Sequence, residues 1–301
     1  MVDMSQSHLV GDLDRDRLLA LIAEQVGEHG VGYIPPVIEF WDELPSTNAY
    51  LADQWTRRSD ELRDGTLVLT GHQSAGLGRR DRTWLTPPGS ALTMSVLVDL
   101  DRIAPRHRTL LSALAGLAVA ECVGDLTTAQ VRLKWPNDVV AEVSDAADLD
   151  QWGRWRKLAG VLTVLVNDGE RTAAVIGIGL NVRQRANELP VPHATSVALL
   201  TADETEALDR TELAANVMTR LLTRVTQLRS GRSEEILGSI AAASMMVGRR
   251  VRAALADGLV IEGEAIGLGE SGQLVIRDLA GNHHALLEGD ITQVRPAGSD
   301  A

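Results

Sequence analysis

The sequence has very little lysine and almost no cysteine. Among its 301 residues there are 27 arginines but only two lysines, Lys134 and Lys157. Cys122 is the only cysteine, which excludes a disulfide framework and a cysteine-rich zinc site. It lies in the apolar stretch "LLSALAGLAVAECV", where a buried structural thiol is expected. In a chain that uses arginine almost everywhere else, the positions of the two lysines are informative.

Long apolar runs and a basic excess are also missing. No stretch reaches membrane-spanning length, and the N-terminus lacks the charged-then-apolar pattern of a signal peptide. The net charge of −12 argues against a general nucleic-acid or membrane-surface binder, since such proteins carry a basic face. With 45% hydrophobic residues the chain can bury a sizeable core. We therefore expect a soluble cytoplasmic protein with no nucleic-acid or membrane partner.

The order of the predicted elements indicates an α+β fold. Helical spacing over 13–29 is followed by alternating strand and helix patterns, and helices are predicted near 209–229 and 233–243. From about Val247 the chain changes to short alternating strands with turns, which predicts a small appended β-barrel. We expect three parts: an N-terminal helical extension at 1–36, a catalytic domain at 37–244 and a C-terminal β domain at 245–297.

The stretch "GHQSAGLGRRDRTW" at 71–84 is the part of the sequence with the most residues suited to ligand binding. Gly76 and Gly78 allow tight turns and close approach to a ligand, and the nearby arginines match phosphate or carboxylate oxygens. A solvated surface hairpin is the alternative interpretation. The stretch is not a dinucleotide fingerprint, because Asp81 stands where the third glycine would be, and the chain contains no Gly-Lys-Ser/Thr phosphate loop.

Each lysine begins or ends a predicted strand beside a turn or a glycine. Lys134 precedes "WPND", in which Asn137 and Asp138 are ligand types suited to Mg²⁺ or nucleotide hydroxyls. Lys157 opens the otherwise apolar strand "KLAGVLTVLV". Lysine is a compact, mobile point charge, so it suits a narrow gap between two anionic oxygens better than arginine does. A plain turn and a solvated strand end remain the structural alternatives.

Taken in order, these motifs resemble those of the biotin protein ligases. The matching stretches are "PSTN", "QSAGLGRRDRTW", "KWPND", "KLAGVL", "GIGLNV" and a β-rich end closing in "GDITQVR", together covering roughly 37–296. The resemblance implies a mixed-sheet catalytic domain like that of class II aminoacyl-tRNA synthetases and lipoate ligases, plus an SH3-like C-terminal domain. It also implies formation of biotinyl-5′-AMP from biotin and ATP with Mg²⁺, then transfer of biotin to a lysine of a biotin carboxyl carrier domain.

The resemblance also implies roles for individual residues. Lys157 and Arg79 are expected to be catalytic. The remaining positions form groups around biotin, around ATP and around the metal. Biotin is assigned Ser46, Thr47, Asn48, Gln73, Gly76, Gly78, Arg79, Arg80, Lys157 and Gly160; ATP is assigned Lys134, Trp135, Asn137, Asp138, Gly177, Gly179 and Asn181; Mg²⁺ is assigned Asp138 and Asn181.

The sequence departs from the family pattern in several places, among them Val164, where the family often has an acidic residue. Leu77 replaces the first arginine of the glycine-rich loop, and Asp81 replaces its third glycine. The insertion at 142–156 is longer than the usual short hairpin, and its role is open. About 36 residues precede the core, too few for the DNA-binding domain of the longer family members, so no repressor role is expected. A lipoate or octanoate ligase and a non-catalytic biotin-binding module remain alternatives, and homodimerisation stays open.

Overall fold

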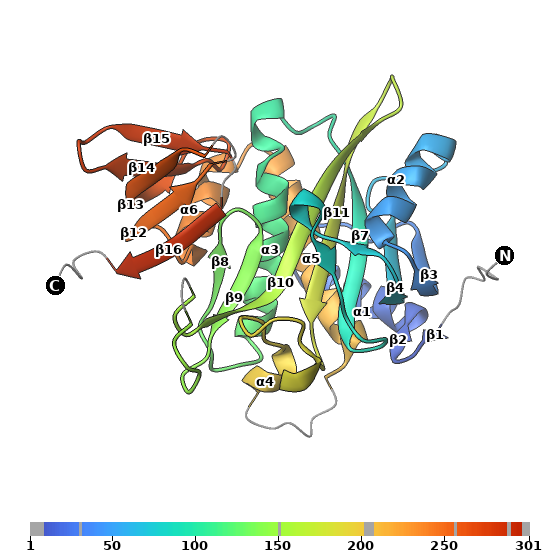
Figure 1. The fold of residues 1–301 in the computed structure, drawn as a ribbon. Coiled ribbons are helices and arrows are strands. Elements are labelled where there is room, and N and C mark those ends of the chain that lie inside the picture. The colour runs from blue at the N-terminus through green and yellow to red at the C-terminus, as the bar shows by residue number, and fades with distance from the viewer. Residues whose placement is uncertain are drawn as a thin grey trace.

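The structure, a computed structural model shown in Figure 1, describes residues 9–29, 32–149, 152–201, 208–255, 258–287 and 290–296. The ends of the N-terminal and C-terminal segments expected from the sequence lie outside these residues. The helices are α1 (Arg15–His29), α2 (Thr47–Arg58), α3 (Leu110–Gly124), α4 (Val197–Leu200), α5 (Arg210–Arg229) and α6 (Ser233–Ala243). No helix among the described residues is long and apolar enough to cross a membrane.

The strands form two larger sheets and two small ribbons. The central sheet has the order β3-β4-β7-β11-β10-β9-β8, in which only the β3–β4 pair is parallel. Its members are β3 (Ile38–Leu44), β4 (Leu67–Gln73), β7 (Ala91–Asp99), β8 (Val131–Lys134), β9 (Asp138–Glu142), β10 (Trp155–Asn167) and β11 (Thr172–Asn181). The ribbons pair β1 (Leu9–Val10) with β2 (Leu13–Asp14), and β5 (Gly76–Leu77) with β6 (Thr83–Trp84).

Helices cover the two faces of the central sheet unequally. One face packs against α3, with α5 and α1 stacked behind it, as Figure 1 shows. The opposite face, here called the outer face, is covered by α2. Alternation along the strands divides the side chains between these faces: Ile176 belongs to the α3 core, whereas Val175 packs with Trp55 of α2. Because α2 has only 12 residues, it leaves part of the outer face uncovered.

The N-terminal segment is built into the main core. Leu18 and Ile22 of α1 are fully buried in the same hydrophobic cluster as the helix α3 residues. Beside them, the buried guanidinium of Arg210 contacts the Asp12 carboxylate at 2.5 Å and donates to the Ala91 carbonyl at 3.0 Å. The extension therefore contributes to the stability of the sheet, and the boundary near residue 36 remains a prediction.

The C-terminal strands form an antiparallel sheet of their own with the order β15-β14-β13-β12-β16. They are β12 (Arg249–Ala254), β13 (Val260–Leu268), β14 (Leu274–Asp278), β15 (His283–Leu286) and β16 (Asp290–Pro296). This sheet is joined to the central sheet at two points. Met245 N donates to Leu133 O at 2.9 Å, and Trp135 Nε1 donates to Gly272 O at 3.1 Å. The C-terminal unit is thus hydrogen-bonded to the strand and turn that contain "KWPND".

The expected combination of a mixed-sheet α+β domain and a small all-β unit is confirmed, whereas the exact domain boundaries stay predictions. The predicted helices at 209–229 and 233–243 correspond to α5 and α6. The short ribbons β1–β2 and β5–β6 and the helix α4 had no periodic signal in the sequence, because elements of two to four residues are too short to show one. Cys122 is buried, as expected, and burial raises the pKa of its thiol to about 12.

Candidate active site

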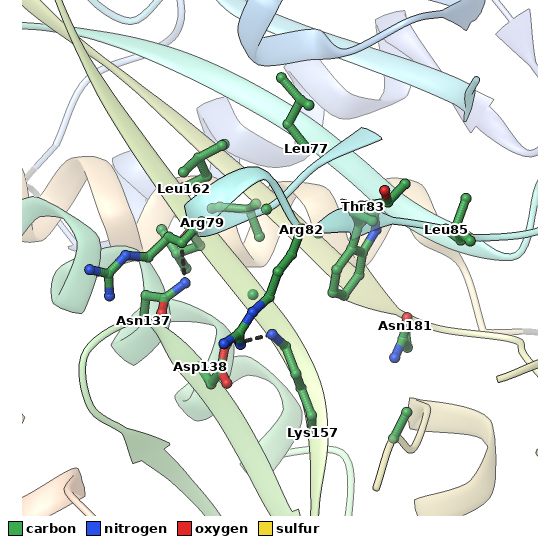
Figure 2. Close-up of a pocket in the computed structure, with 18 of the residues that line it drawn as sticks. Leu77, Arg79, Arg82, Thr83, Leu85, Asn137, Asp138, Lys157, Leu162 and Asn181 are labelled. Carbon is green, nitrogen blue, oxygen red and sulfur yellow. Dashed lines mark hydrogen bonds and ion pairs between the residues drawn. The ribbon is translucent and has the colours of Figure 1, made fainter. Parts of the chain in front are cut away.

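The uncovered part of the outer face forms the floor of a cavity of about 500 Å³. The glycine-rich loop, the "KWPND" turn and the start of β10 form its walls, as Figure 2 shows. Of the residues that the sequence assigned to biotin, ATP or the metal, all but Gly76 line this cavity. Both lysines of the chain are among them, although they lie 23 positions apart on β8 and β10, with β9 between these strands. The tertiary fold therefore gathers the predicted residues into one site, and their individual roles remain proposals.

The N-terminus of α2 forms one end of the cavity. The Ser46 hydroxyl caps the helix by accepting from Ala49 N, and Thr47 N donates to Gln73 Oε1 at 2.8 Å. Ser95 Oγ donates to Asn48 Oδ1 at 2.6 Å, while Asn48 Nδ2 donates to Leu162 O at 2.8 Å. These buried polar groups hold one another in place, so this end presents oriented amides and hydroxyls to a ligand.

Glycines on neighbouring strands form the floor. Gly177 pairs with Leu162 and Gly179 pairs with Gly160 across β10 and β11. A Cβ at Gly177 would lie 2.4 Å from Asn48 Oδ1, and one at Gly179 would lie 2.7 Å from the Trp84 ring. A side chain at either position would collide with Asn48 or Trp84, so the glycines allow these two cavity-lining residues to pack directly on the floor.

We expect Gly177→Ala to weaken binding of the substrate that occupies this end of the cavity. The new methyl group would force Asn48 out of its hydrogen bonds, at a cost of about 1–3 kcal/mol for an overpacked site. If binding loses a contact of the same size, biotin affinity should fall by about fivefold or more, measured by isothermal titration calorimetry. Gly238→Ala, on α6 with nothing within 4 Å of the added Cβ, should leave the affinity unchanged.

The two lysines contact different neighbours within the cavity. Lys157 Nζ forms an ion pair with Asp138 Oδ1 at 2.6 Å and lies 5.8 Å from the centroid of the Trp84 ring. Lys134 Nζ lies 4.2 Å from the centroid of the Trp152 ring. Figure 2 shows Asp138 and Lys157 pointing toward each other, with the Arg82 side chain extending toward them from the loop. Positive charge therefore converges on the middle of the cavity.

The carboxamides expected on the ATP side are partly engaged in structural hydrogen bonds. Asn137 Nδ2 donates to Val161 O at 2.8 Å, which ties the turn to β10. Asn181 Nδ2 donates to Thr195 O at 2.9 Å, and its Oδ1 accepts from Gln184 Nε2 at 3.1 Å. The described residues contain no group of three or more His, Cys, Asp or Glu side chains that could cage a metal. Asp138 is the best-placed carboxylate for a Mg²⁺ that keeps most of its ligands from substrate phosphates and water.

The glycine-rich loop crosses the cavity as the β5–β6 ribbon and a short 3-10 turn at Arg79–Asp81. Arg80 has a φ of 54°, in the left-handed region that side chains rarely adopt. Gly76 is not among the residues that line the cavity, and a Cβ there would be 2.4 Å from Trp84 O. Close packing of the ribbon therefore accounts for glycine at this position, and its contact with biotin stays a prediction.

Two further segments line the cavity that sequence reasoning did not assign to it. One is Trp152 of the insertion, whose ring stacks on His193 with centroids 4.4 Å apart and an interplanar angle of 17°. The other is the segment 190–194, held by a hydrogen bond from Lys157 N to His193 O. Burial lowers the pKa of His193, and the charges of Lys134 and Lys157 lower it further. Neither segment has a periodic pattern or a motif, so only the fold brings them to the site.

Comparisons with known proteins point to the same protein family as the sequence motifs do. The model of the Biotin/lipoate A/B protein ligase family matches residues 41–181. The chain is 32% identical to the biotin–[acetyl-CoA-carboxylase] ligase of Mycobacterium tuberculosis, over 94% of this chain and 99% of that protein. It is 35% identical to the bifunctional ligase/repressor BirA of Salmonella typhimurium, over 69% of this chain and 56% of that longer protein.

A solved structure shares the fold. The biotin protein ligase from Aquifex aeolicus in complex with biotin and ATP superposes with a TM-score of 0.69 at 26% identity, covering 87% of this chain and all of that one. Fold, cavity and sequence similarity define a ligase that modifies proteins with a vitamin-derived group. The chain belongs to the biotin protein ligase family.

Proposed function

We propose that the protein is an ATP-dependent biotin–[acetyl-CoA-carboxylase] ligase. The observation that carries this proposal is that the only two lysines of the chain, Lys134 and Lys157, line one cavity beside Asp138 and the arginine-rich loop. A site that joins a carboxylate to a triphosphate must place positive charge where these two anions meet. The full-length relative from Mycobacterium tuberculosis is named for this activity.

In the first step, a carboxylate oxygen of biotin bonds to the α-phosphorus of ATP, and pyrophosphate leaves. Biotin would occupy the end of the cavity formed by Ser46–Asn48 and Gln73, with its carboxylate toward Lys157. ATP would occupy the side formed by Lys134, Asn137 and Asp138. The compact ammonium of Lys157 can contact both reacting oxygens at once. To do so, Lys157 would leave its ion pair with Asp138.

A magnesium ion is part of this proposal. Bound with the triphosphate, it would supply charge neutralisation on the phosphate oxygens, and Asp138 is the residue that would hold it. Asn181 would act chiefly by orienting the floor, because both ends of its carboxamide are already hydrogen-bonded. The chain's own contribution is thus to align the two anions and to exclude water.

In the second step, a lysine amine of the acceptor attacks the carbonyl carbon of biotinyl-5′-AMP. AMP leaves and the amine loses a proton, so biotin ends in an amide bond. We infer that the acceptor is the biotin carboxyl carrier domain of an acyl-CoA carboxylase, bound transiently. Nucleic acid is not part of the proposal, in keeping with the net charge of −12, and a cytoplasmic location is inferred because the reaction consumes ATP.

Mass spectrometry of a biotin carboxyl carrier domain after incubation with the protein, biotin and MgATP tests the proposal. We expect the acceptor to gain one biotinyl group. Replacing biotin by lipoate in the same assay examines the other activity named in the family description. Modification by lipoate alone would overturn the proposed substrate, and biotin binding without modification of the acceptor would indicate a non-catalytic binding module.

We expect Arg79→Gly to release the adenylate faster. Arg79 lines the cavity from the loop that crosses it, and its guanidinium can contact the adenylate phosphate. Losing one charge-assisted contact of about 1.5–3 kcal/mol should raise the dissociation rate by about tenfold or more. Stopped-flow retention of biotinyl-5′-AMP measures this rate. Arg102→Gly, at an exposed surface position, should retain the adenylate as the unmodified protein does.

A further inference from the structure

The described residues of the insertion at 142–156, whose role the sequence left open, are linked by backbone and side-chain hydrogen bonds. Leu149 and Gly153 exchange backbone hydrogen bonds at 3.0 and 2.7 Å. The guanidinium of Arg156, which is only 6% exposed, donates to Ala147 O at 2.6 Å and to Gly153 O at 2.9 Å. The insertion is therefore tied to the first residues of β10, which also position Lys157.

Trp152 projects from the insertion into the cavity wall. Its ring packs partly against the hydrophobic cluster of the C-terminal sheet and stacks on His193. The Lys134 ammonium lies 4.2 Å from the centroid of the same ring, within the range of a cation–π interaction. Trp152 thus contacts two cavity residues that come from different parts of the chain.

The backbone of β10 fixes the stacking partner as well. Lys157 N donates to His193 O at 2.6 Å, and Thr195 N donates to Lys157 O at 2.8 Å. The residue after Trp152 is therefore bonded to Arg156, and His193 is bonded to the adjacent Lys157. Lysine has a long and mobile side chain, so an aromatic ring fixed in this way restricts where the Lys134 ammonium can lie.

We propose that Trp152 is a positioning residue that holds the Lys134 ammonium and the His193 ring in place for the nucleotide, which makes the 142–156 insertion part of the nucleotide half of the site. The inference rests on the proposed function for the identity of the nucleotide. Trp152 acts through Lys134 and His193, so its loss should weaken nucleotide binding. The end of the cavity at Ser46–Asn48 should keep its affinity for biotin.

Two substitutions distinguish a role of the aromatic face of Trp152 from a role in apolar packing alone. Trp152→Leu keeps apolar volume against the C-terminal cluster but removes the π face, whereas Trp152→Phe keeps a π face. Arg154→Ala is the matched control, because Arg154 belongs to the same insertion, is half exposed and is not among the cavity-lining residues. For each protein, calorimetry gives the dissociation constants of MgATP and of biotin, and biotin-dependent ATP–pyrophosphate exchange gives KM and kcat.

We expect Trp152→Leu to raise the dissociation constant and the KM of ATP by about fivefold, because the substitution removes a partly buried cation–π contact. The kcat should stay within about twofold of that of the unmodified protein. Trp152→Phe should recover most of the affinity, and Arg154→Ala should match the unmodified protein. The inference would be overturned if Trp152→Leu left the ATP affinity unchanged, or if Trp152→Leu and Trp152→Phe lost the same amount of ATP affinity. A loss of biotin affinity in parallel with the loss of ATP affinity would overturn it as well. Absence of exchange in the unmodified protein would instead contradict the proposed function, and ATP binding would still test the role of Trp152.

Discussion

Lys157→Ala should reduce biotin-dependent ATP–pyrophosphate exchange by about 10²–10³-fold, the usual effect of removing one group that stabilises developing charge. Lys157 lines the cavity together with Asp138, the loop arginines and the glycine floor, and its compact ammonium suits the narrow gap between the reacting oxygens better than a guanidinium does. The measurement is exchange of labelled pyrophosphate into ATP with biotin present. Near-normal exchange by this variant would remove the main support for the assignment.

Lys157→Arg is the informative companion to this substitution. It keeps the charge but replaces a compact ammonium with a planar fork, so we expect it to recover only a small part of the activity. Both variants should retain the melting temperature to within a few degrees, because the side chain is a quarter exposed and its ion pair with Asp138 is partly solvated. A large loss of stability would mean that the ion pair serves the fold more than the reaction.

Asp12→Ala should lower the free energy of unfolding by about 3 kcal/mol at pH 7, at the lower end of the range for breaking a buried ion pair. The substitution leaves the guanidinium of Arg210, which is 1% exposed, without its carboxylate partner beneath the N-terminal segment. Asp12 itself is 28% exposed, which is why the lower end applies. Urea denaturation followed by circular dichroism measures the change. Asp16→Ala, at an exposed position in the first turn of α1, should cost less than about 1 kcal/mol.

The effect of Asp12 should depend on pH. Burial alone would raise the pKa of Asp12, but the hydrogen bonds and charge of Arg210, with that of Arg183, outweigh it and lower the pKa. A carboxyl whose pKa is lower in the folded state stabilises the protein above its unfolded value of 3.8, and that stabilisation is lost as the pH falls through the folded pKa. The difference between the Asp12→Ala variant and the unmodified protein should therefore shrink in acid. A constant difference down to the lowest pH at which both proteins stay folded would contradict this account.

The sequence located most of the cavity-lining residues where they lie in short local motifs, and their roles stay predictions. "PSTN", "KWPND" and "KLAG" each contain a polar or charged residue at the end of a strand or the start of a helix, and such positions tend to border clefts. Gly177 and Gly179 could be selected only through the resemblance. The reason they must be glycine appears in the structure, where Asn48 and the Trp84 ring occupy the space of a side chain.

Residues that reach the site through long-range packing could not be predicted. Trp152 and His193 lie outside the motifs, and in the structure Arg156 binds the insertion while the adjacent Lys157 binds the segment that carries His193. The structure likewise shows that Gly76 serves the packing of the ribbon and that Asn181 is held by Gln184 and Thr195. No periodicity or spacing in the sequence encodes such contacts.

By itself, the sequence determined the α+β class, the small C-terminal β unit, the family and most of the cavity-lining residues, because hydrophobic periodicity and local motifs depend on neighbouring residues. The tertiary structure alone decided that both lysines face one cavity, that Asn48 and Trp84 pack on the glycines of its floor, and that the 142–156 insertion carries an aromatic ring to Lys134. These features depend on which strands pair and which face each helix covers, and that choice is made by burial of apolar surface across the whole chain.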